Sequence, residues 1–317
     1  MPCKVQLELK PDAPIEASLR SILRWLFEGI VGNVPGLLED QDPEFLHSLR
    51  VAIRRTRSAI GQISGVLPKQ PLHHFKAEFR WLGAETSPCR DLDVLLLSIR
   101  QPPSEPGEAA AEAMQSIFAA AEIHRERAWR QAANAVRASR FEQLADDWRA
   151  FLHRPSAHGA LTAKARQPTF EVAHGRVHKA NRRLLERAEK LGRPPEANDL
   201  HRLRIDAKKL RYLLEFFACF FPADSVSARI DALKDLQDCL GASNDCTVQT
   251  EMLHRFAAEI DADGRLTKAT SREFQRLLTE IEVRRRQNLH ALPAILAALR
   301  DHTPAERPEA EVPPEKF

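Results

Sequence analysis

The sequence is poor in glycine, tyrosine and cysteine. Of its 317 residues, 12 are glycine, one is tyrosine and five are cysteine. Scarce glycine and little alternation of apolar with polar residues argue against a β-sandwich or barrel and favour helices. The cysteine count is odd, and no pair has the CxxC spacing of a zinc ribbon. We therefore expect neither a disulfide scaffold nor a zinc site, and a reducing cytoplasm suits the pattern.

Long apolar runs, an export signal and a large net charge are also missing. No 18 consecutive apolar residues occur, which argues against a membrane span. Residues 1–20 lack an apolar signal core and contain the acids Glu8, Asp12 and Glu16. The formal net charge is only +3, so any anion site must arise from local clustering of basic residues. We expect a cytoplasmic protein with no membrane partner.

A basic motif occurs twice, as HSLRVAIRRTR from residue 47 and as HRLRIDAKKLR from residue 201. The copies are 154 residues apart, and the same offset matches Arg80 with Lys234 and Asp91 with Asp245. A register held over this distance is typical of an internal duplication, and the period is too long for a solenoid repeat. The sequence therefore predicts two domain-sized halves.

Helical spacing places most basic residues of the motif on one side of a helix. At 3.6 residues per turn, His47, Arg50, Arg54 and Arg57 fall within about 80° of arc, beside an apolar stripe. Arg55 points elsewhere. The first copy contains no acid, so no helical ion pair neutralises its arginines. A solvated face is the ordinary reading of a charge run, but recurrence in the second half favours an anion-binding surface.

Apolar spacing, prolines and capping residues predict an all-α fold of two helical bundles with about four long helices each. We place an N-terminal extension at residues 1–12, bundles at residues 13–153 and 169–303, a linker at residues 154–168 and a disordered tail at residues 304–317. The expected helices cover residues 13–33, 43–65, 71–85, a segment from Ser87, 108–138, 141–153, 169–191, 198–221, 225–240, 244–261 and 268–301.

The two motifs, with RDLDVLL from residue 90 and LKDLQDCLGASND from residue 233, resemble the CHAD family (conserved histidine α-helical domain). The resemblance covers roughly residues 13–300 and leaves no segment for the CYTH triphosphatase domain that some members carry. It implies one domain of two four-helix bundles with pseudo-twofold symmetry. It also implies a basic groove between them that binds inorganic polyphosphate, without catalysis or a cofactor, in the cytoplasm at polyphosphate granules.

The resemblance implies two matched sets of ligand-binding side chains. They are His47, Arg50, Arg54, Arg57, Arg80 and Arg90 in the first half, and His201, Arg204, Lys208, Arg211 and Lys234 in the second. A second tier that would extend the basic surface consists of Arg20, Arg24, Lys76, His174 and His178. One departure weakens the second set, because Asn244 stands where the first half has Arg90.

Several alternatives remain open at this stage. His47 and His201 are either anion ligands or satisfied core histidines. His174 and His178 have the spacing of two metal ligands, but only Glu171 offers a third donor at helical spacing, and we expect no metal.

Two other functions compete with polyphosphate binding. A nucleic-acid or acidic-protein binder would use the same basic stripe, although a single-strand binder needs exposed aromatic rings, which are scarce here. An enzyme acting on polyphosphate needs carboxylates that hold Mg²⁺ and usually a phosphate-cradling loop. No GxxxxGK[ST] occurs, and helix capping accounts for Asp91, Asp93 and Asp245.

Overall fold

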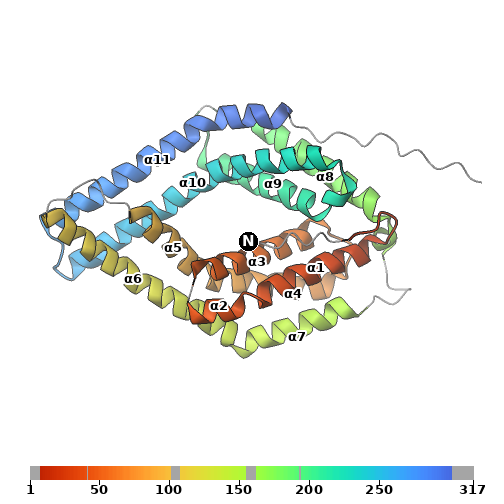
Figure 1. Cartoon of the computed structure of the whole chain (residues 1–317), viewed down its shortest axis with the longest axis horizontal. Helices are drawn as coiled ribbons and strands as arrows, with labels where there is room; N and C mark the ends of the chain where they lie inside the picture. The colour runs from red at the N-terminus through yellow and green to blue at the C-terminus, as the bar shows by residue number, and fades with distance from the viewer. Residues whose placement is uncertain (1–7, 41, 101–107, 155–161, 193, 302–317) are drawn as a thin grey trace, which may run out of the picture.

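The structure is a computed structural model that describes residues 8–40, 42–100, 108–154, 162–192 and 194–301. All regular elements in these ranges are helices, as expected for an all-α protein. Within the same ranges, none of the helices combines the length and apolarity needed to cross a bilayer. Figure 1 shows the helices arranged as an elongated body, with α3 and α9 facing each other near its middle.

The first half contains seven helices within the described ranges. They are α1 (Ile15–Val31), α2 (Val34–Glu39), α3 (Pro43–Gln62), α4 (Lys69–Glu85), α5 (Ser87–Ile99), α6 (Glu108–Arg137) and α7 (Ser139–His153). The sequence predicted a break rather than a helix near Pro35. Instead, Pro35 lies in the first turn of α2, where its missing N–H costs nothing.

The second half contains fewer and longer helices. They are α8 (Thr169–Glu189), α9 (Ala197–Phe216), α10 (Ala223–Ala262) and α11 (Lys268–Asp301), with short 3₁₀ turns at Ala163–Arg166 and Ala218–Phe220. Adding 154 to the first and last residue numbers of α3 gives the first and last residue numbers of α9. Residues 101–107, residues 155–161 of the predicted linker and the predicted tail at 304–317 lie outside the described residues.

The prediction of two helices at residues 225–240 and 244–261 was wrong, because α10 runs unbroken through both. In the first half, Pro88 separates α4 from α5. Its counterpart at the same offset is Ala242, which keeps its N–H and continues the helix. Gly241 weakens the helix by about 1 kcal/mol relative to alanine but does not end it.

The first half has an aromatic core between α4 and α7. Trp148 of α7 is fully buried, and its ring meets Phe75 and Phe79 of α4 at centroid distances of 4.6 and 5.1 Å in edge-on geometry. Such edge-on pairs add about 0.5–1.5 kcal/mol each beyond the area they bury. This packing anchors α4 against α7.

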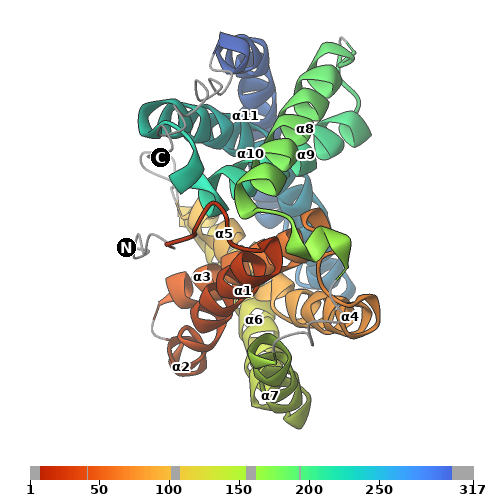
Figure 2. The ribbon, with the colours of Figure 1, turned by 90° about the vertical axis from the view of Figure 1, so that its right-hand side faces the viewer.

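The two halves meet chiefly along α6 with α11, α3 with α9 and α5 with α10, and α1 also contacts α8 and α6 contacts α10. Figure 2 shows the first half below and the second half above when the molecule is seen from one end. At that end the segments before α1 and α8 lie antiparallel and exchange hydrogen bonds. Ile15 N donates to Gln167 O and Thr169 N to Ala13 O, both at 2.9 Å, on either side of Pro14 and Pro168. These residues are equivalent at the offset of 154, so this contact has local twofold character.

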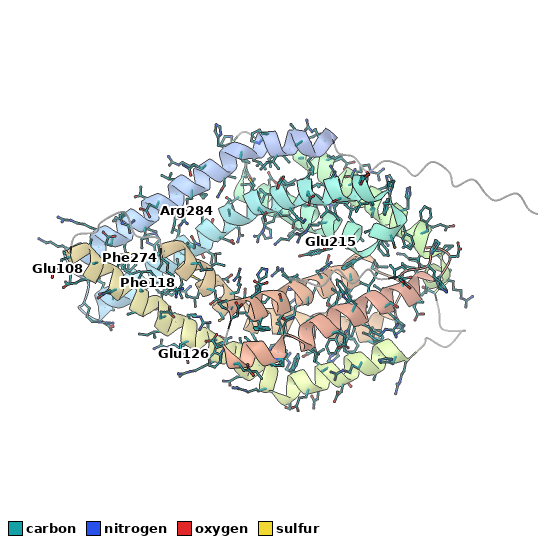
Figure 3. All side chains as sticks on the ribbon, in the orientation of Figure 1. Glu108, Phe118, Glu126, Glu215, Phe274 and Arg284 are labelled. Carbon is teal, nitrogen blue, oxygen red and sulfur yellow. The ribbon has the colours of Figure 1, made fainter. Side chains whose placement is uncertain are left out.

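A half-buried ion pair fastens α3 to α9. Arg55 Nη2 lies 2.8 Å from Glu215 Oε2, with both side chains about one-fifth exposed. The Arg55 guanidinium also lies over the rings of Trp25, Tyr212 and Phe216, at 4.9, 5.8 and 5.5 Å. Figure 3 labels Glu215 near the middle of the molecule, where α9 faces α3. Arg55 therefore joins α1, α3 and α9 at the contact between the halves.

We expect Glu215→Ala to lower the free energy of unfolding by about 2 kcal/mol, because it leaves the half-buried Arg55 without its counter-charge. Urea denaturation measures the loss. Glu186→Ala is the matched control, since its partner Arg182 is 3.8 Å away and both side chains are more than half exposed. It should change stability by less than about 0.5 kcal/mol. Equal losses in the two variants would show that the Arg55 pair does not hold the halves together.

Candidate anion-binding site

Arg54 of α3 and Arg204 and Lys208 of α9 form the centre of a basic cluster where the two helices meet. The charge of Arg54 contributes to lowering the pKa of both Arg204 and Lys208, after burial as the main cause. The three cations are therefore close enough to repel one another, and all are half-buried. The two predicted stripes thus approach each other through these residues.

Arg50 is half-buried one turn before Arg54 and is held at the junction between α4 and α5. Its Nη1 donates to Gly83 O at 3.0 Å and to Thr86 Oγ1 at 3.2 Å, and its Nη2 donates to Ser87 Oγ at 3.1 Å. Burial, followed by the charge of Arg54, lowers the pKa of Arg50 to about 10. Arg50 stays charged at neutral pH, in a fixed position beside Arg54.

His47 and Arg90 extend the cluster along the first-half motif. Burial and then the charge of Arg90 lower the pKa of His47 from its ordinary value of 6.5, with Arg54 and Arg50 adding to the effect. His47 is therefore mostly neutral at pH 7 in the free protein. A neutral imidazole still donates one hydrogen bond, so His47 keeps a role as a donor to an anion.

Two aspartates lie among these cations. Asp91 acts on Arg50 and Arg204, and Asp245 acts on Arg204 and Lys208, in each case raising the pKa of the cation. Ser87 Oγ donates to Asp91 Oδ2 at 3.3 Å. The capping explanation was wrong for Asp245, which lies in the interior of α10. The sequence does signal this pair, because Asp91 and Asp245 match at the offset of 154 residues. Helix capping offered a simpler explanation for the same two residues.

Asp93, the third aspartate assigned to capping, has a separate structural role. It is 4% exposed and accepts a bond from Arg125 Nε of α6 at 2.9 Å. The other end of Arg125 grips both carboxylate oxygens of Asp40, at 2.6 and 2.7 Å. This network ties α6 to α5 and to the end of α2, so capping does not account for Asp93.

The other predicted ligands lie at different distances from the centre. Arg211 lowers the pKa of Lys208 and lies 3.5 Å from Glu215. Arg57 and Arg80 are exposed and close together, since Arg80 lowers the pKa of Arg57. Lys234 is exposed and pairs with Asp231 at 2.8 Å. His201 is exposed at the start of α9, one turn before Arg204.

The second-tier residues lie in different environments. The expectation that Arg20 adds to a basic surface was wrong, because it is 6% exposed and bonded to Glu16 at 2.6 Å and to the Phe151 carbonyl. It packs α1 against α7. Arg24 is exposed and donates to Ser21 Oγ at 3.1 Å, and Lys76 is half-buried on α4.

The histidines of the second tier pair with each other on α8. His178 Nε2 and His174 Nε2 are 3.1 Å apart, and the His174 ring stacks on Phe170 and Phe221. Among the described residues, no group of three or more histidine, cysteine and carboxylate side chains is placed to hold a metal ion.

The cluster keeps hydrogen-bond donors that no side chain or backbone group in the described ranges accepts. The buried Nε atoms of Arg50, Arg54 and Arg204 belong to this set. An unsatisfied buried donor costs about 1–3 kcal/mol, and the cost is larger when the group is charged. These Nε atoms are closed to solvent, so it is the convergence of the cations, and not the Nε donors, that suits an anion with several oxygens.

The surroundings of Lys208 give a testable dependence of stability on pH. Burial, then Arg204, Arg54 and Arg211, lower the pKa of Lys208 from 10.5 to about 7. Between pH 7 and pH 10.5 the Lys208 amine is protonated in the unfolded chain but largely neutral in the folded protein. Its contribution therefore makes the free energy of unfolding rise with pH. We expect Lys208→Met to raise the melting temperature at pH 6 and to give a much smaller gain at pH 9.

Lys209→Met is the control, because the Lys209 amine lies 3.9 Å from the Asp206 carboxylate. Thermal unfolding of both variants across this pH range measures the trend. A constant gain for Lys208→Met at pH 6 and pH 9 would contradict the crowding of cations around it.

The chain is similar to a known protein family and to solved structures. No curated protein matches the chain. In the solved structures, the chain is similar to the crystal structure of the CHAD domain from the plant Ricinus communis, with 28% identity and a TM-score of 0.77 over 95% of this chain and 98% of that one. PptA from Streptomyces chartreusis shares the fold at 18% identity and a TM-score of 0.62, over 92% of this chain and 99% of that one. The family model for the CHAD domain matches residues 21–254, and the chain therefore belongs to the CHAD domain family.

Proposed function

We propose that this protein binds inorganic polyphosphate, or a comparably phosphate-rich anion, at the basic cluster between α3 and α9, and does not catalyse its breakdown. The observation that carries the proposal is the convergence of Arg54 with Arg204 and Lys208 where α3 meets α9. Arginine forks match phosphate oxygens in two-point contacts, and lysine adds a compact charge.

The two halves arise, in this proposal, from an internal duplication with a pseudo-twofold axis between two bundles. The shared bounds of α3 and α9 at the offset of 154 support it, as do the reciprocal hydrogen bonds around Pro14 and Pro168. A linear polyphosphate has no chemical direction, so its two ends can meet equivalent half-sites. A nucleic-acid strand is directional and fits such a site less well.

The length of the basic stripe suits a chain-like ligand. A helix rises 1.5 Å per residue, so the first-half stripe from His47 to Arg57 spans about 15 Å. Several successive phosphates of one chain would lie along this distance. In the proposed path, the chain enters at the exposed pair Arg57 and Arg80, and passes Arg54, Arg204 and Lys208 at the centre.

The two aspartates at the centre favour binding over catalysis. Phosphoryl transfer requires Mg²⁺ held by carboxylates. Here Asp91 and Asp245 are each engaged electrostatically with arginine or lysine side chains. Their role in this proposal is to offset part of the repulsion while the ligand is absent. The proposed location is the cytoplasm, at polyphosphate granules.

Charge reversal at the centre tests the site directly. We expect Arg54→Glu combined with Lys208→Glu to weaken binding of long-chain polyphosphate at about 150 mM salt by more than tenfold, or about 1.4 kcal/mol. The reason is that two attractions become repulsions at the point where the halves meet. A titration followed by fluorescence or calorimetry measures the affinity, with circular dichroism as the folding check.

Arg127→Glu combined with Arg272→Glu is the matched control. Both arginines are exposed, lie on α6 and α11, and give the same change in net charge. Arg55, which points away from the stripe as predicted, is unsuitable because its ion pair with Glu215 supports the fold. A site at the α3–α9 contact predicts a small loss in the control, whereas diffuse attraction to a basic surface predicts equal losses.

Competition separates polyphosphate from nucleic acid as the ligand. We expect single-stranded DNA at the same concentration of phosphate to compete at least tenfold less well than polyphosphate. The physical reason is that the described residues bring no exposed aromatic platform to the cluster, so bases gain little by stacking. Displacement of labelled polyphosphate at several salt concentrations measures the difference. Equal competition at every salt concentration would favour a general polyanion binder instead.

A further inference from the structure

The two motif arginines at equivalent positions, Arg50 and Arg204, differ in how their donors are used. Arg50 donates three hydrogen bonds, at 3.0, 3.2 and 3.1 Å, to the junction between α4 and α5. The Arg204 guanidinium makes no hydrogen bond and no close ion pair with any described residue. Its Nε is closed to solvent, whereas its two Nη atoms are not. Of the two arginines, Arg204 is therefore the one that keeps terminal donors within reach of a ligand.

A proline accounts for the difference. Pro88 separates α4 from α5, so carbonyl groups in the last turn of α4 lack donors within their own helix. Arg50 donates to one of them, Gly83 O, and its charge suits the partly negative C-terminal end of a helix. At the offset of 154 residues α10 continues through Ala242, and its carbonyls accept from its own N–H groups. No helix end remains there for Arg204 to cap.

A second difference between the halves lies just after this break. Arg90 is near the start of α5, and Asn244 holds the equivalent position inside α10. The charge of Arg90 adds to burial in lowering the pKa of His47, so Arg90 lies beside the motif. Arg90 is half-buried and makes no hydrogen bond or close ion pair with any described residue. The neutral side chain of Asn244 in the second half is therefore balanced by the release of Arg204.

We propose that Arg90 in the first half and Arg204 in the second are the corresponding ligand-binding cations, and that Arg50 is a positioning residue that fixes Arg90. Each half then presents two available cations to a phosphate chain, Arg54 with Arg90 and Lys208 with Arg204. The ligand in this inference rests on the proposed function. The inference goes further by giving unequal roles to two arginines that the repeated motif makes equivalent.

The positioning role follows from the two helices that Arg50 joins. Its Nη1 donates to Gly83 O in the last turn of α4, and its Nη2 donates to Ser87 Oγ in the first turn of α5. Ser87 Oγ in turn donates to Asp91 Oδ2 at 3.3 Å. One guanidinium thus spans the break, and the direction of the first turn of α5, which carries Arg90, depends on it.

Double-mutant cycles with long-chain polyphosphate at about 150 mM salt test these roles. Arg204→Gln and Arg90→Gln should each weaken binding about tenfold and reduce the slope of log affinity against log salt concentration by about one, because each loses a phosphate contact. Arg50→Gln should also weaken binding. Combined with Arg90→Gln it should cause no further loss, because Arg50 acts through Arg90, whereas its loss should add to that of Arg204→Gln.

Ser87→Ala gives a second test of the positioning role, because it removes one bond of Arg50 at the start of α5 and keeps every charge. It should weaken polyphosphate binding by the wild-type chain and leave binding by the Arg90→Gln variant unchanged. Additive losses for Arg50→Gln and Arg90→Gln would overturn the positioning role and make Arg50 a ligand. Wild-type affinity in Arg204→Gln would overturn the assignment of Arg204.

Thermal unfolding separates the two arginines without any ligand. Arg50→Gln should lower the melting temperature by several degrees, because Gly83 O loses a charged donor. Arg204→Gln should leave it unchanged or raise it, because it removes repulsion with Arg54 and Lys208. Equal falls in both variants would overturn the contrast. A wild-type chain that binds no polyphosphate would instead refute the proposed function and the ligand roles, while unfolding would still decide the role of Arg50.

Discussion

The repulsion among Arg54, Arg204 and Lys208 is the constraint on which the rest of the central structure depends. Like charges brought together in a half-buried site raise the free energy of the folded state, and they add to burial, the larger cause, in lowering the pKa of Lys208. Other interactions must therefore hold α3 against α9. Candidates in the structure are the Arg55–Glu215 ion pair, the two aspartates at the cluster and the apolar packing beneath both helices. The site is thus an unfavourable arrangement held in place by favourable neighbours.

On each motif helix, one of two adjacent basic residues faces the cluster and the other pairs with an acid that supports the fold. Successive side chains on a helix are about 100° apart, so Arg54 faces the cluster while Arg55 reaches the aromatic rings and Glu215. Lys208 and Lys209 differ in the same way, since the second lies near Asp206. Asp206 in turn accepts bonds from Arg183 and Arg187 of α8, which binds α8 to α9. In each of the two pairs, Arg54–Arg55 and Lys208–Lys209, the first side chain therefore contributes a positive charge to the cluster. The second contributes a positive charge to an ion pair within the fold.

Much of the fold could be predicted because helices follow local sequence. The start of α5 at Ser87 and the end of α7 at His153 follow from turn residues and apolar spacing. The continuity of α10 was missed because a glycine and an asparagine resemble a break, whereas only a proline like Pro88 enforces one. The burial of Arg20 and the environment of Arg55 were also missed, since both depend on partners far along the chain: Phe151 lies 131 residues from Arg20, and Glu215 lies on the other half. Helical angle shows where a side chain points but not what it meets there.

A site that is repulsive when empty has a consequence for how a polyanion would act on the whole molecule. The ligand would neutralise the cations from both halves at once, so the free energy that repulsion removes from the empty protein would be recovered on binding. Any ligand that binds only the folded state stabilises it, and here part of that gain would come from relief of repulsion across the α3–α9 contact. Binding would also favour the charged form of Lys208 and draw in a proton near neutral pH, because opposite charge raises the pKa of an amine. Ligand affinity, the association of the halves and the protonation of one lysine are therefore coupled through the same three side chains.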